Sequence, residues 1–146
     1  MAGASLLPTH WIHHVSLHVP LVLPAVLTCL GLLTWRDEEV SRHVKFMRWL
    51  GLFCLGATTV AILAGMASAP GLLGGDGSAV LRDHRDLGVT AWCVILLAAL
   101  SHDAGVRQQD VSYRRLGTCL WGVATLAVIG AGHWGGLHEH AKHIPF

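Results

Sequence analysis

The sequence predicts an all-α integral membrane protein, an up-down-up-down bundle of four helices with both termini outside. Of its 146 residues 53% are hydrophobic and only 13% are charged, whereas charged residues make up about a quarter of a soluble domain. A charge at the bilayer centre costs about 3 kcal/mol or more. The long stretches that lack any charge are therefore expected to cross a membrane, and they cover residues 1–35, 49–75, 87–102 and 116–138.

The expected spans form a single domain, residues 1–146, that ends in a histidine-rich tail over residues 138–146. Pro20 and Pro24 lie inside the first span, where each removes a helical hydrogen bond and favours a bend near His18. The second span is rich in small residues, which let membrane helices approach closely. Asp83 is expected to cap the start of the third span. The spans run over about 15–35, 49–69, 84–101 and 116–137, joined by connections at 36–48, 70–83 and 102–115.

Basic residues are unevenly divided between the two expected sides of the membrane. Cytoplasmic connections of bacterial membrane proteins carry an excess of Lys and Arg. Connections 36–48 and 102–115 hold seven of the ten Lys and Arg residues, and the other side holds Arg82, Arg85 and Lys142. We therefore expect a multi-pass protein of the bacterial inner membrane with periplasmic termini. Trp35, Trp49 and Trp121 are expected to form its cytoplasmic aromatic belt.

The four cysteines fall one in each span and form no CxxC pair. Free cysteine is among the most buried residue types, so they are interpreted as small apolar residues in helix packing. They are Cys29, Cys54, Cys93 and Cys119.

Three histidines are expected at the same depth. His18, His84 and His133 each lie 18 residues from a polar residue at the cytoplasmic end of their span. At 1.5 Å per residue each separation is about 27 Å, which places all three near the outer edge of the hydrocarbon. An ionisable residue in such a place is a functional hypothesis by default. His43 and His102 lie on the opposite side and are interpreted as polar residues at the interface.

Haem, a bare metal ion and a proton relay are the three possibilities for these histidines. A b-type haem needs two imidazoles from opposite sides of the ring, and His18 and His84 would supply them from diagonal helices. Arg82 and Arg85 could pair with the haem propionates. A second haem, or a replacement ligand, could use His133 with His13, His14 or His140. His14 and His18 share a helix face, as a zinc or copper site would require, and histidine also suits a pH switch.

Short motifs stand at both ends of the chain: His13, His18, Val19 and Pro20 near its start, and Gly132, His133, Gly135, Gly136 and His140 near its end. These motifs resemble those of a family of predicted four-helix bacterial membrane proteins of unknown function. Members of that family often open with H-P-x-x-V-H-F-P, and those associated with c-type cytochromes often close with G-H-x-G-G and a further histidine. The resemblance implies a redox-associated membrane module with a b-type haem site on its outer face. His14 stands where the family has proline, and the tail that holds His138 and His143 cannot be aligned.

The expected function is electron transfer by a membrane protein that binds one b-type haem, or two. It would pass electrons between a quinol or a partner subunit and periplasmic c-type cytochromes, as part of a larger redox complex. His138 and His140 are possible extra ligands. No nucleophile or acid–base pair suggests catalysis by this chain alone, and nucleic acid is not an expected partner. The alternatives are a structural subunit of a respiratory or photosynthetic complex and a metal-binding protein of the periplasmic face.

Overall fold

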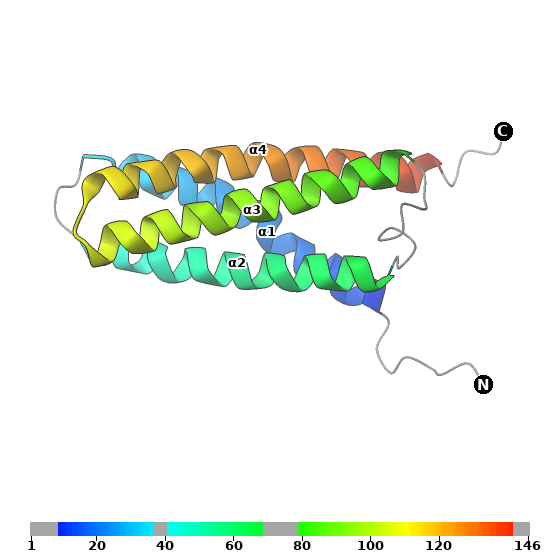
Figure 1. Cartoon of the computed structure of the whole chain (residues 1–146), viewed down its shortest axis with the longest axis horizontal. Coiled ribbons are helices and arrows are strands. Elements are labelled where there is room, and N and C mark those ends of the chain that lie inside the picture. Colours follow the sequence, from blue (N-terminus) through cyan, green and yellow to red (C-terminus); the bar gives the residue numbers. More distant parts are fainter. Residues whose placement is uncertain (1–8, 37–40, 69–78, 142–146) are drawn as a thin grey trace.

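The computed structural model describes residues 9–36, 41–68 and 79–141 and forms four long helices (Figure 1). No strand occurs in these three ranges. Each helix contains a stretch long and apolar enough to cross a membrane, which confirms the prediction of an all-α, multi-pass membrane protein. The helices are α1 (Thr9–Leu33), α2 (Arg42–Ser68), α3 (Ala79–Arg107) and α4 (Val111–Ala141).

The helices extend beyond the predicted spans, so the predicted connections are too long. Residues 42–48 belong to α2, and between α3 and α4 only residues 108–110 lie outside a helix. Gln109 has a φ of 56°, in the left-handed region typical of a tight turn. The predicted cap at Asp83 is wrong because α3 already begins at Ala79. The absence of charge marks the part of a helix inside the hydrocarbon, and a helix continues past it because each further residue adds a hydrogen bond.

Each helix packs mainly against two of the other three. The α1–α2 and α3–α4 contacts are the most extensive, the α1–α4 and α2–α3 contacts are smaller, and the α1–α3 and α2–α4 pairs scarcely touch. Helices α1 and α3 are therefore diagonal in the bundle. Figure 1 shows α3 passing from beside α4, where α3 begins, to beside α2, where α3 ends. The two pairs α1–α2 and α3–α4 consequently diverge toward the end that carries the start of α1 and the end of α4 (Figure 1).

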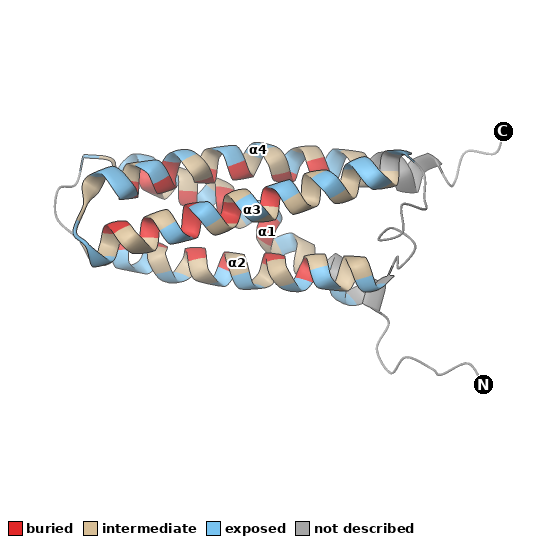
Figure 2. Ribbon diagram, in the orientation of Figure 1, coloured by how far each residue is buried: buried red, intermediate tan, exposed pale blue. Residues whose placement is uncertain are grey.

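Buried residues follow the inward faces of the helices (Figure 2). Leu27, Ile95 and Trp121 are almost completely buried. The prediction of Trp121 in the cytoplasmic aromatic belt is therefore wrong. A Cβ on Gly51 would lie 3.0 Å from the Trp121 ring, so this glycine of α2 makes room for the indole. Periodicity alone could not distinguish an indole that points inward from one at the interface.

The outward faces are also apolar, as a lipid environment requires. Leu33, Leu63 and Leu126 are 80%, 61% and 71% exposed, and a soluble protein seldom presents so many large apolar side chains to water. Because lipid is as apolar as these side chains, the bundle depends on close packing between helices rather than on the hydrophobic effect.

The contact between α1 and α4 depends on Gly31. A Cβ on Gly31 would collide with the side chain of Thr118, which is itself buried on α4. One turn further along, Gly122 faces Thr28 of α1. Small residues thus bring the two helices together in the half of the bundle where α1 ends.

We expect Gly31→Ala to lower the unfolding free energy in detergent by about 1–3 kcal/mol, the usual cost of overpacking. Gly56→Ala is the matched control, because a Cβ on Gly56 meets nothing within 4 Å. That control should be neutral or slightly stabilising, since alanine favours helix. Thermal unfolding followed by circular dichroism measures both. Equal effects of the two substitutions would contradict close packing at Gly31.

Candidate functional site

His84 is held against α4 by a hydrogen bond and by a glycine. Its Nδ1 lies 2.8 Å from the carbonyl oxygen of Ala131. A Cβ on Gly135 would lie 3.0 Å from both Cε1 and Nδ1 of the ring, so the imidazole rests on the α4 backbone at this glycine. Ala131 and Gly135 are four residues apart and share one face of α4. Together they form a flat seat for the ring.

The hydrogen bond determines the tautomer of His84. A carbonyl oxygen can only accept, so Nδ1 carries the hydrogen and donates it. The neutral ring then keeps its lone pair on Nε2. No hydrogen bond within the described residues engages Nε2. Histidines that bind a metal through Nε2 commonly show this arrangement, because they usually donate their other N–H to a carbonyl or carboxylate.

His18 and His133 lie near His84 in height but do not face it. A Cβ on Gly132 would contact Leu21 of α1, which places the turn of α1 that carries His18 beside the turn of α4 that carries His133. Both histidine side chains are exposed. Nδ1 of His18 lies 3.3 Å from the carbonyl oxygen of Val15 in its own helix. The structure thus brings His84, but not His18 or His133, onto an inward seat.

The glycines of the closing motif serve a different residue from the one expected. The expected site residue of this motif is its own histidine, His133. His133 is instead exposed, with its ring centroid 6.2 Å from that of Trp134, and Gly135 receives His84. The physical reason is the helical period, since α4 continues through this motif and points neighbouring residues in different directions.

The two arginines expected at the propionates are at the start of α3. Arg82 is exposed. Nε of Arg85 donates to Asp86 at 2.7 Å. Arg85 therefore makes a local ion pair, and Arg82 lies at the surface on the same turn as His84.

Four other predicted ligands have side chains outside the described part of the structure. Among the residues that it does describe, no group of three or more His, Cys, Asp or Glu side chains could hold a bare metal ion. The four ligands with undescribed side chains are His13, His14, His138 and His140.

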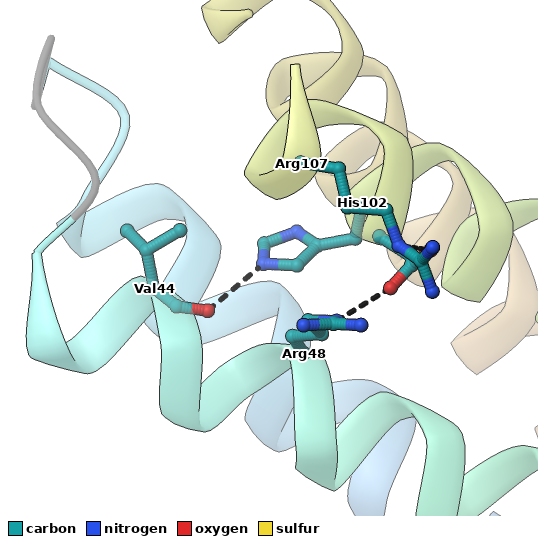
Figure 3. A network of polar contacts seen from close by, with 5 residues as sticks. Val44, Arg48, His102 and Arg107 are labelled. Atoms are coloured by element: carbon teal, nitrogen blue, oxygen red, sulfur yellow. Dashed lines mark hydrogen bonds and ion pairs between the residues drawn. The ribbon is translucent and has the colours of Figure 1, made fainter. Parts of the chain in front are cut away.

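A polar cluster that the sequence analysis missed lies at the opposite end of the bundle (Figure 3). Asp103 pairs with Arg48 of α2 at 2.5 Å and with Arg107 of its own helix at 2.8 Å. His102 is 3% exposed, and its Nε2 lies 3.4 Å from the carbonyl oxygen of Val44. The interpretation of His102 as an interfacial residue is therefore wrong. The four-residue spacing of Asp103 and Arg107 was the signal available, because it favours an ion pair on a helix.

A second set of polar side chains lies beside this cluster, between the end of α1 and the start of α4. Arg114 is 5% exposed, whereas Arg115 is half-buried. Nε of Arg115 donates to the carbonyl oxygen of Trp35 at 3.2 Å, and its guanidinium lies 5.6 Å from the centre of the Trp35 ring. These contacts join α1 to α4, as Asp103 joins α3 to α2.

We expect Asp103→Asn to lower the unfolding free energy in detergent by about 2 kcal/mol, since hydrogen bonds to charged groups contribute about 1.5–3 kcal/mol. Asp83→Asn removes the same charge from an exposed position of α3 and should change stability by less than about 0.5 kcal/mol. Thermal unfolding at low and at high salt measures both. Equal destabilisation by the two variants would exclude a special role for Asp103.

Comparisons of the chain with protein-family models, with curated proteins and with solved structures found no match. The function proposed for this protein therefore rests on the chemistry of its own residues.

Proposed function

We propose that this chain is a b-type haem protein of the bacterial inner membrane that transfers electrons near the periplasmic face. The observation that carries the proposal is the state of His84. Its Nδ1–H is bound to the Ala131 carbonyl and its Nε2 is directed away from that bond. Haem iron binds neutral imidazole nitrogen, and a backbone carbonyl behind the ring fixes the imidazole for that purpose.

The number of donors favours haem among the possible ligands. Gly135 and Ala131 hold the imidazole against α4 on its Nδ1 side, and Nε2 makes no hydrogen bond within the described residues. A bare divalent ion would need three or more donors close together, and the described residues supply no such group. Two imidazoles are sufficient for haem.

The second axial ligand is proposed to be His18. It lies on α1, the helix diagonal to α3, in the same end of the bundle. Its side chain is exposed and would have to turn from the carbonyl of Val15 toward the bundle axis. His133 is the alternative, and a second haem would draw on His13, His14, His138 or His140.

We also propose the up-down-up-down topology with both termini periplasmic. Contacts between the start of α3 and the end of α4, and between the end of α1 and the start of α4, are those that antiparallel neighbours make. The excess of Lys and Arg in connections 36–48 and 102–115 supports a cytoplasmic location for that end. A haem near His84 would then exchange electrons with a periplasmic c-type cytochrome, and with a quinol or a partner subunit in the membrane.

Protein purified with adequate haem supply should show a Soret band and a b-type pyridine haemochrome. We expect His84→Ala to lose most of the haem, because it removes an axial ligand, while His43→Ala should keep it. His43 is an exposed histidine at the other end of the bundle. Helix content from circular dichroism shows whether each variant folds. The absence of a Soret band from the wild-type protein would exclude the haem proposal and favour a structural subunit.

Gly135→Ala tests the seat of the ring separately from the ligand itself. A Cβ there would lie 3.0 Å from the imidazole, so the ring must shift, and changes beside a ligand typically weaken metal binding about tenfold or more. Gly130→Ala is the matched control, since its Cβ would make only an ordinary 3.9 Å contact with Leu87. Haem titration and the reduction potential are the measurements. If Gly135→Ala left both unchanged while His84→Ala abolished binding, His84 would bind haem in another orientation.

A further inference from the structure

We propose that the end of the bundle opposite His84 binds the phosphate of an anionic phospholipid, and that Arg115 is the residue that recognises it. The site lies between the end of α1 and the start of α4, on Trp35, Thr34 and Arg115. Because it lies at the other end of the bundle from His84, it does not depend on haem binding.

Arg115 is held in place by its neighbours while most of its donors stay available. Its Nε–H donates to the carbonyl oxygen of Trp35, which lies just past the end of α1 and so has no place in the helical hydrogen-bond pattern. The guanidinium also lies 5.6 Å from the centre of the Trp35 ring. The four N–H groups of its two terminal nitrogens have no hydrogen-bond partner among the described residues. A guanidinium fork fixed in this way suits the paired oxygens of a phosphate.

The surroundings of Arg115 favour an anion. A small cavity beside it is lined by nine residues, including Thr34, His102, Arg114 and Thr118, and by no carboxylate. His102 is 3% exposed, and its Nδ1 has no partner in the described part of the chain. A buried polar group of this kind costs free energy unless it is paired.

The described carboxylates at this end are engaged elsewhere. Asp103 pairs with Arg48 and Arg107, on the α2 side of the cluster. Oδ1 of Asp110 accepts a hydrogen bond from the backbone N–H of Ser112 at 2.7 Å. Neither of these two described carboxylates is paired with Arg115.

The position of Arg115 and Trp35 along the helices favours a lipid as the source of the phosphate. The apolar span of α1 ends at Leu33 and that of α4 begins at Val111. Trp35 and Arg115 thus lie at the ends of two spans, where lipid headgroups are expected. Exposed apolar side chains continue from this point toward the middle of the bundle, with Leu32 on α1 at 60% and Val123 on α4 at 51% exposure. A phosphate at Arg115 would therefore direct its acyl chains along these two residues.

The test measures lipid binding to the full chain in detergent by native mass spectrometry and by thermal shift. The probes are phosphatidylglycerol, phosphatidylcholine and inorganic phosphate. We expect the wild-type protein to retain phosphatidylglycerol and to be stabilised by it, and Arg115→Gln to weaken that binding at least about fivefold, since one basic residue contributes about 1 kcal/mol at a lipid surface. Arg42→Gln removes an equal charge from an exposed position on α2 and should weaken it less than about twofold.

Four results would overturn the proposal. If the protein bound phosphatidylcholine as tightly as phosphatidylglycerol, the net charge of the headgroup would not contribute to recognition. Equal weakening by Arg42→Gln would show that only net charge matters. Stabilisation by inorganic phosphate alone, at the same concentration, would replace the lipid with a free anion. Finally, Arg115→Gln could lower thermal stability to the same extent with and without phosphatidylglycerol and leave lipid binding unchanged. Arg115 would then serve only the fold.

Discussion

The bilayer leaves no water to satisfy the backbone, and this constraint determines where polar chemistry can occur in the protein. Every backbone N–H and C=O inside the hydrocarbon must be bonded within a helix, so the interior of the bundle is left for apolar and small side chains. Hydroxyl groups in the spans follow the same rule. Thr58, Thr28 and Thr125 each donate to a carbonyl one turn earlier in their own helix. Ion pairs and histidines are consequently confined to the ends of the helices.

The two ends are held together in different ways. At the end where α1 meets α4 and α2 meets α3, Arg115 bonds to Trp35 and Arg48 pairs with Asp103. A contact too close for any side chain at Gly31 adds to them. At the opposite end, among the described residues, His84 contacts the carbonyl oxygen of Ala131, which lies within the α3–α4 pair. The pairs α1–α2 and α3–α4 are therefore joined by charged residues at one end and by the Trp92–Thr59 hydrogen bond nearer the middle. They diverge toward the other end (Figure 1).

The number of helices could be predicted from the sequence because charge is excluded from the hydrocarbon, and four uncharged stretches gave four helices. The helix ends could not, because a charged segment such as residues 42–48 continues a helix as well as it forms a loop. Counting residues from the polar end of each span predicted one depth for His84 and His133, which agrees with the contact between His84 and Gly135, two residues from His133. The residue count could not predict whether each side chain points into the bundle or out of it. That direction depends on the rotation of each helix, which packing partners such as Gly51 and Trp121 determine.

The helix pairs diverge at the end that carries His84, which makes it easier for a flat ligand to bind there. A fully packed bundle would have to separate its helices to admit a flat ring, and core packing resists changes of even one methylene. Here the side chain of His84 is held by its contact with Ala131 of α4, and this contact does not involve α1. A ring bound at Nε2 would enter between pairs of helices that also meet at Gly132 and Leu21. The charged contacts between the pairs lie at the other end, so the contacts at Gly31 and Asp103 could persist while the ring binds. One end of the bundle thus holds the helices together, while the helices diverge at the other end, where the cofactor site is proposed. The bundle can therefore be stable and still admit a cofactor.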